Sequence, residues 1–216
     1  MNLYFISGLG ADKRVFQKLI LPDLFIIHHI EWVHVSGHES MDSYCRRLSQ
    51  QIDQTQPFIL IGLSFGGLIA IRMSSFLSPV QTVIISSFCF KREVPAFYIF
   101  LSMTRLYRLL PARFLLKPNN ILFRLFGANE PVKRKMLKSI LEDTDPVLFR
   151  WAVKQLFSFE NNWKPESFLH IHGTADKILP LNARMDAIPV EGGEHLMVYS
   201  KAEVVSELLN QNLRRE

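Results

Sequence analysis

The stretch Phe58-Ile-Leu-Ile-Gly62-Leu-Ser64-Phe-Gly66-Gly67 decides the fold of this 216-residue chain. Four apolar residues lead directly into Gly-x-Ser-x-Gly, and apolar residues at helical spacing follow. This pattern predicts a strand, a sharp turn with Ser64 at its apex, and a helix. Gly62 and Gly66 have no Cβ, so the strand end and the helix start can pass close together. The Phe65 N–H lies in the first helical turn, where donors lack partners, so it can face a negative oxygen beside Ser64.

Short apolar segments alternate with segments of helical spacing along most of the chain. Strands are expected at residues 3–6, 24–30, 58–61, 81–86, 167–171 and 187–190. Helices are expected from Asp12 to about residue 21, from residue 41 to about 54 with Ser40 as N-cap, between Ser64 and Pro79, and over 198–213. The alternation is typical of an α/β fold, with a mostly parallel sheet of about six strands and helices on both faces.

Residues 88–164 interrupt this alternation, because they contain helical stretches separated by prolines and no strand-like run. The interruption falls between the fourth and fifth strands, so the insertion is expected at the C-terminal edge of the sheet, above Ser64. We therefore predict an α/β core formed by residues 1–87 and 165–216, and a helical cap formed by residues 88–164. Apolar side chains of the cap are expected to line the substrate pocket, with Phe97, Phe100 and Leu101 as candidates.

The segment from Lys91 to Lys164 is strongly basic, with fourteen Lys and Arg residues against six Asp and Glu. The whole chain has a net charge of +5, so the remainder is acidic overall. One interpretation is that a small helical cap fills a large solvated surface with basic residues. The other is that the cap attracts anionic substrates or makes peripheral contact with a membrane surface.

The composition is that of a chain that folds around one core, since 48% of the residues are hydrophobic and 21% are charged. The N-terminus does not resemble a signal peptide, and no apolar run reaches the roughly 18 residues of a membrane span. Cys45 and Cys89 have neither metal-ligand nor redox spacing, which predicts reduced thiols and a cytoplasmic protein. Without interleaved basic and aromatic residues in a nucleic-acid motif, nucleic acid is not an expected partner.

A serine hydroxyl becomes a strong nucleophile only with a base in hydrogen-bond reach and a third group that orients the base. Six of the seven histidines lie in or beside predicted strands or before a helix, and we interpret them as structural. His195 instead follows the last strand in a glycine-containing loop, at the same rim as Ser64. Asp176, in the turn after the fifth strand, is the predicted orienting acid, because no carboxylate follows the fourth strand. Glu194 is the competing carboxylate beside His195.

These segments carry a resemblance. Gly62-Leu-Ser64-Phe-Gly66, His172-Gly-Thr-Ala-Asp176 and Gly192-Gly-Glu-His195 resemble the catalytic motifs of the α/β-hydrolase superfamily, in the same chain order. Ser7-Gly8-Leu9-Gly10 resembles its oxyanion loop, although many members have His where this chain has Ser7. The resemblance implies that Ser64 is the nucleophile, His195 the base and Asp176 the orienting acid. It also implies an oxyanion hole formed by the Leu9 and Phe65 N–H groups, with no metal and no organic cofactor.

The expected function is hydrolysis of a small-molecule carboxylic ester or thioester through an acyl-enzyme on Ser64. Two alternatives stay open from the sequence. One is a ligand receptor that keeps these residues without turnover, and the other is an acyltransferase or lyase that uses the same site. The substrate and the oligomeric state are not specified by the sequence, because specificity lies in the cap rather than in the fold.

Overall fold

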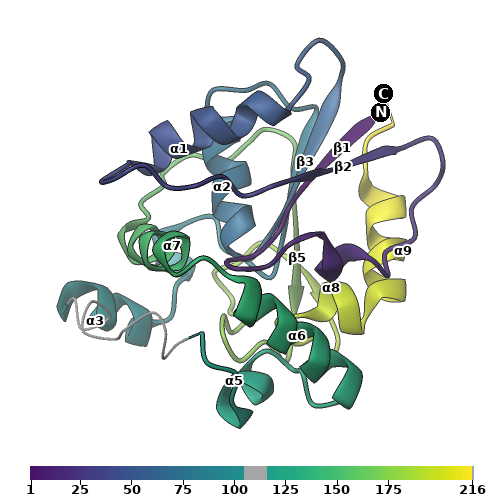
Figure 1. Ribbon diagram of the computed structural model, residues 1–216. Coiled ribbons are helices and arrows are strands. Elements are labelled where there is room, and N and C mark those ends of the chain that lie inside the picture. The colour runs from purple at the N-terminus through teal and green to yellow at the C-terminus, as the bar shows by residue number, and fades with distance from the viewer. Residues whose placement is uncertain (105–115, 216) are drawn as a thin grey trace.

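The computed structural model describes residues 1–104 and 116–215. Six strands form one sheet in the order β2-β1-β3-β4-β5-β6, and every neighbouring pair is parallel (Figure 1). The strands are β1 (Asn2–Ile6), β2 (Ile26–Ile30), β3 (Phe58–Leu63), β4 (Gln81–Ile85), β5 (Phe168–Gly173) and β6 (Ile188–Val190). The predicted α/β class, the parallel sheet and its six strands are confirmed.

The strand register brings the C-terminal ends of the central strands to one edge of the sheet. Ile6 of β1 lies opposite Gly62 of β3, and Leu63 of β3 lies opposite Ile85 of β4. The chain also reverses its direction across the sheet between β1 and β3, because β2 lies on the outer side of β1. In open parallel sheets, ligands bind outside the carboxyl ends of the strands at such a reversal point.

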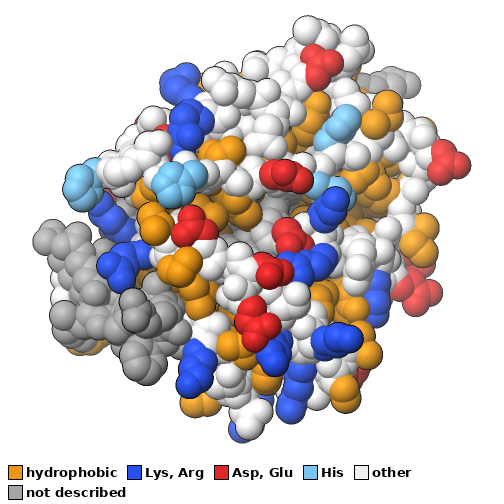
Figure 2. Space-filling model, viewed as in Figure 1, with side chains coloured by type: hydrophobic (Ala, Val, Ile, Leu, Met, Phe, Trp, Pro, Cys, Tyr) orange, Lys and Arg blue, Asp and Glu red, His pale blue; other side chains and the backbone are white. Residues whose placement is uncertain are grey.

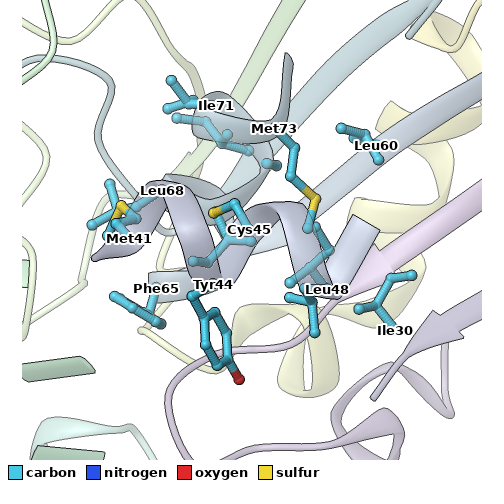
Figure 3. Close-up of a cluster of buried hydrophobic side chains, with 14 of the residues drawn as sticks. Ile30, Met41, Tyr44, Cys45, Leu48, Leu60, Phe65, Leu68, Ile71 and Met73 are labelled. Carbon is cyan, nitrogen blue, oxygen red and sulfur yellow. The ribbon is translucent and has the colours of Figure 1, made fainter. Parts of the chain in front are cut away.

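Helices cover both faces of the sheet (Figure 1). One face packs against α1 (Met41–Leu48), α2 (Phe65–Ser74) and α7 (Pro146–Ser158), and the other against α6 (Pro131–Asp143), α8 (Met197–Ser200) and α9 (Ala202–Asn212). Alternate residues of β1 therefore enter different cores: Tyr4 and Ile6 join the first, whereas Leu3 and Phe5 join the second. Figure 3 shows the first core, where side chains of α1 and α2 meet.

The helices outside residues 88–164 are shorter than the sequence pattern predicts. The expected helix from Asp12 to residue 21 is only a 3₁₀ turn, Lys13–Phe16, capped by the Asp12 side chain. Its outer end has little to pack against, since Ile20 is 77% exposed. The helix capped by Ser40 ends at Leu48 and continues as the 3₁₀ turn Ser49–Gln51, and the last expected helix is divided into α8 and α9 at Lys201.

Between β4 and β5 the described residues contain helices and no strand. They form the 3₁₀ turn Lys91–Glu93, α3 (Ala96–Thr104), α5 (Asn120–Leu125), α6 and α7. Two of the prolines that separate the helical stretches, Pro131 and Pro146, occupy the first position of α6 and α7, where no intrahelical N–H bond is lost. Residues 105–110, which end the apolar stretch that begins at Ala96, lie outside the described residues.

The inserted helices share the cores of the sheet. Leu148 and Trp151 of α7 belong to the first core, while Leu137 and Ile140 of α6 belong to the second. The division into a core and a separate cap therefore stays a prediction. None of the helices within the described residues is long and apolar enough to cross a membrane.

Candidate active site

Ser64 sits at the turn between β3 and α2 in a conformation that non-glycine residues rarely adopt, with φ 52° and ψ −117°. Its N–H donates to the Ile85 carbonyl (2.8 Å), and its carbonyl accepts from the Ser87 hydroxyl (2.7 Å). A Cβ at Gly62 would overlap the Gly66 backbone, and a Cβ at Gly66 would overlap the backbone that follows β1. The surrounding contacts thus hold a strained turn, as is common at functional sites.

The structure brings Ser64, His195 and Asp176 into one chain of hydrogen bonds. His195 Nε2 lies 2.9 Å from Ser64 Oγ, and His195 Nδ1 lies 2.8 Å from Asp176 Oδ2. His195 and Asp176 are each only 4% exposed. An ionised carboxylate can only accept, so Nδ1 carries the ring proton. The Nε2 lone pair is then free to accept the proton of the Ser64 hydroxyl.

Asp176 is held as a carboxylate by its own turn. Its second oxygen, Oδ1, accepts from the backbone N–H groups of Ile178 (2.9 Å) and Leu179 (2.8 Å). Burial pushes the pKa of Asp176 up, but His195 and these backbone donors outweigh it, so the pKa lies below its ordinary value. Glu194 instead pairs with Lys177, with 3.6 Å between Oε1 and Nζ. The geometry therefore brings Asp176, and not Glu194, to His195.

Two buried histidines lie behind Asp176. His172 Nε2 donates to the Leu179 carbonyl (2.7 Å) and lies 3.6 Å from Asp176 Oδ2. Its Nδ1 must then accept from His170 Nε2, at 3.1 Å, if both rings are neutral. Burial lowers the pKa of His170 to about 3 and also lowers the pKa of His172. These histidines, interpreted from the sequence as structural, brace the turn that carries Asp176.

Acid should destabilise the fold through this histidine pair. Between pH 6.5, the ordinary pKa of histidine, and about 3, the unfolded chain binds a proton at His170 that the folded chain does not. The free energy of unfolding therefore falls as the pH drops through this window. We expect His170 to contribute on the order of a few kcal/mol, equivalent to about 10 °C in Tm.

His170→Gln tests this expectation, because glutamine keeps an N–H donor for His172 but does not titrate. The fall of Tm between pH 6.5 and 4 should be shallower in this variant than in the wild type. His38→Gln, at an exposed position, should leave the slope unchanged. Equal slopes for wild type and His170→Gln would contradict the assignment.

The loop after β1, which carries Gly8 and Leu9, lies beside Ser64. A Cβ at Gly8 would lie 3.5 Å from Ser64 Cβ, so the loop contacts the turn directly. Throughout residues 1–104 and 116–215, the Leu9 and Phe65 N–H groups have no hydrogen-bond partner. The loop that carries the Leu9 N–H thus lies against the turn of Ser64, and the oxyanion hole stays a prediction.

An apolar cavity of about 80 Å³ opens beside Ser64 and His195. Its walls come from the segment after β4, from α3, from α7 and from the turn after Asp176; they include Phe88, Val94, Tyr98, Ile99, Ser102, Leu156, Phe157, Phe159, Ile178 and Leu179. The candidate pocket residues Phe97, Phe100 and Leu101 are not among the described residues that line it. Phe97 and Phe100 are 66% and 58% exposed, because α3 turns its Tyr98 and Ile99 face to the cavity.

Several residues that contact the site are not marked by any motif in the sequence. The Phe126 ring meets the His195 ring edge to face, with 5.5 Å between centroids. The Tyr98 hydroxyl donates to the Ile178 carbonyl (2.6 Å), which braces the Asp176 turn from α3. The Thr144 hydroxyl lies 3.0 Å from the Gly10 carbonyl. Each of these residues lies in the inserted helical segment, far from the motifs in sequence. Only the structure shows that it lies near them in space.

The described basic side chains of the inserted segment lie largely at the surface, and Figure 2 shows Lys and Arg over the region of α5 and α6. Several are paired with carboxylates: Lys133 with Glu130 (2.7 Å), Lys138 with Glu142 (3.8 Å) and Lys164 with Asp186 (2.8 Å). Such exposed pairs contribute little to stability. They offset part of the positive charge of the segment, and both interpretations of its basic surface stay predictions.

Within residues 1–104 and 116–215, no group of three or more His, Cys, Asp or Glu side chains is arranged to hold a metal ion.

The chain is similar to known proteins in sequence pattern and in fold. The alpha/beta hydrolase family model matches residues 3–208. A search of curated proteins finds no significant match. Among solved structures, a thermophilic esterase from Thermogutta terrifontis has 15% identity and a TM-score of 0.70, with 98% of this chain and 88% of that chain covered.

Two other solved structures have the same fold. MenH from S. aureus has 17% identity and a TM-score of 0.71, with 98% of this chain and 94% of that chain covered. The 2-hydroxy-6-oxo-6-phenylhexa-2,4-dienoate hydrolase from Rhodococcus sp. strain RHA1 has 15% identity and a TM-score of 0.70, with coverage of 98% and 89%. At these identities the likeness concerns the fold alone. Since the family model matches nearly the whole sequence, the chain belongs to the alpha/beta hydrolase family.

Proposed function

We propose that this protein is a serine hydrolase that cleaves a carboxylic ester or thioester through an acyl-enzyme on Ser64. One observation carries the proposal: Asp176, His195 and Ser64 form a continuous hydrogen-bond chain at a strained turn. The proposal is supported by the Leu9 and Phe65 N–H groups, which have no partner within residues 1–104 and 116–215, and by the adjoining apolar cavity. Membership of the alpha/beta hydrolase family agrees with it.

The mechanism begins when His195 Nε2 removes the Ser64 proton as Oγ bonds to the substrate carbonyl carbon. The carbonyl π electrons move to its oxygen, which accepts hydrogen bonds from the Leu9 and Phe65 N–H groups. The intermediate collapses, the bond to the leaving oxygen or sulfur breaks, and His195 returns the proton to that atom. Water then attacks the acyl-enzyme in the same way and releases the acid. Asp176 keeps the ring oriented and stabilises its protonated form throughout.

The cavity favours a short, neutral acyl group. Its volume of about 80 Å³ is smaller than the roughly 150 Å³ of an engineered apolar cavity that binds benzene. Lys91 is the only Lys or Arg among the described residues that line it, and its Nζ lies 2.6 Å from Glu160 Oε1. Because this pair neutralises the lysine, the described part of the cavity wall offers an acyl carboxylate no uncompensated positive charge.

Trimming the cavity wall should lengthen the preferred acyl chain. Leu156→Ala removes apolar atoms from the wall and enlarges the space next to Ser64. We expect the ratio of kcat/KM for a longer acyl ester to that for acetate to rise about tenfold, as one or two extra buried methylenes allow. Phe97→Ala is the matched control, because this side chain lies on the exposed side of α3. If the kcat/KM ratio of longer to shorter ester were the same in Leu156→Ala and wild type, the acyl group would not bind against Leu156.

A panel of aryl esters and acyl thioesters of increasing acyl length tests the proposed function. The proposal predicts turnover of at least one class, dependent on Ser64, with free acid as the product. Negligible turnover together with a ligand-dependent rise in Tm would indicate a receptor instead. An acylated product that forms only with an added alcohol or amine acceptor would indicate a transferase.

A further inference from the structure

We propose that Trp32 is a positioning residue for the oxyanion hole. Its indole N–H holds the loop from Ser7 to Ala11 in the shape that directs the Leu9 N–H towards the substrate oxygen. The inference rests on the proposed function, because it assigns a role in the same reaction.

Trp32 closes the loop through a triangle of hydrogen bonds. Its Nε1 lies 2.9 Å from the Ala11 carbonyl and 3.0 Å from Ser7 Oγ. The Ser7 hydroxyl itself donates to the Ala11 carbonyl, at 2.6 Å. Ser7 is buried, so its bond to the Ala11 carbonyl is shielded from competing water, whereas the two bonds of the indole are partly buried. The two ends of the loop are thereby tied to one donor, with Leu9 midway between them.

The strand register explains why Trp32 reaches this loop. Ile6 at the end of β1 lies opposite Ile30 at the end of β2. Since the strands are parallel, the residues that follow them leave the sheet at the same edge. The Ser7 hydroxyl donates to the Ala11 carbonyl and accepts from the Trp32 indole N–H. The indole adds a donor from the segment that follows the neighbouring strand β2.

Trp32 also contacts the residue that carries the second oxyanion donor. Its ring packs against the Phe65 ring, with 5.9 Å between centroids and 33° between planes. The Phe65 N–H is fixed by α2, whereas the Leu9 N–H belongs to a loop without strand pairing. The Trp32 side chain therefore contacts Phe65 itself and the backbone that supports Leu9. Loss of its N–H should misplace the Leu9 donor more than the Phe65 donor.

Trp32→Phe tests the inference, because it removes the indole N–H and keeps an aromatic ring against Phe65. The matched control is Trp151→Phe. Trp151 Nε1 also donates to a backbone carbonyl, that of Glu39 (2.8 Å), and its ring also packs against Phe65. Each variant loses one indole N–H donor, but only the N–H of Trp32 is bonded to the oxyanion loop, where Ser7 Oγ and the Ala11 carbonyl share it. The measurements are kcat and KM for the best ester of the panel, and Tm.

We expect Trp32→Phe to lower kcat by about 10- to 100-fold with little change in KM, because a displaced donor weakens binding of the transition state only. Trp151→Phe should change kcat by less than about threefold even if its Tm falls equally. Equal kcat losses in the two variants, or a change confined to KM in Trp32→Phe, would overturn the inference. Absence of Ser64-dependent turnover in the wild type would instead overturn the proposed function.

Ser7→Ala provides an independent variant should Trp32→Phe fail to fold. It removes the other donor to the Ala11 carbonyl and should also lower kcat with KM unchanged. If the two side chains act through one loop, the double variant should lose less than the product of the two single losses. Strictly multiplicative losses would contradict a shared role.

Discussion

Ser64→Ala is expected to lower kcat by about 10⁶-fold, since loss of the nucleophile alone abolishes nearly all of the catalysis that the serine, base and acid supply together. The substitution should leave the fold intact. Alanine has the Cβ that serine has, so it adds no new strain at φ 52°, and among the described residues the hydroxyl bonds only to His195. Circular dichroism and Tm should therefore match the wild type while kcat for the best ester falls to the background rate.

Ser86→Ala is the matched control for this substitution. Ser86 also has a positive φ, of 47°, and also lines the cavity. Its buried hydroxyl has no hydrogen-bond partner within the described residues, in contrast with Ser64. We expect its kcat to stay within about tenfold of the wild type. Comparable losses at both positions would mean that the cavity tolerates no change, and that Ser64 has no special role.

Asp176→Asn should lower kcat by about 10⁴-fold, by analogy with the same substitution in serine proteases. An asparagine amide can donate to His195 Nδ1, which would move the ring proton to Nε2. The Nε2 atom could then no longer accept the Ser64 proton. KM should change little, because Asp176 contacts His195 and its own turn rather than the cavity.

Glu194→Gln separates this effect from a general loss of negative charge near the base. Glu194 precedes His195 directly but pairs with Lys177. Its neutralisation should change kcat by less than about tenfold. A larger loss in Glu194→Gln than in Asp176→Asn would show that the orienting acid has been misassigned.

Most of the sheet could be predicted because its strands are buried and therefore consist largely of consecutive apolar residues. β3 and β4 are buried at every residue, so they read as apolar runs bounded by polar residues and turns. The positions of Ser64, Asp176 and His195 followed from the same reasoning, because each lies just beyond the C-terminal end of a strand. Parallel strands deliver such residues to one edge whatever the details of packing.

The inserted helices were less predictable, and α3 shows why. Its residues Ala96–Thr104 are apolar on nearly every side, so hydrophobic periodicity does not mark the side that faces the cavity. Phe97 and Phe100 are large apolar residues, yet Tyr98 and Ile99 line the cavity. Trp32 was missed for a different reason: its contacts with Ser7 and Ala11 depend on the register of β1 and β2, which no local pattern contains.

Labelling with a fluorophosphonate probe tests the central claim most directly, because the probe phosphonylates only a serine that a neighbouring base activates. The labelled protein would be digested and the adduct mapped by mass spectrometry, with Ser64→Ala as the control. The account predicts one modified residue, Ser64, and no labelling of the Ser64→Ala variant. Labelling spread over several serines, or an unmodified Ser64 in folded protein, would contradict it.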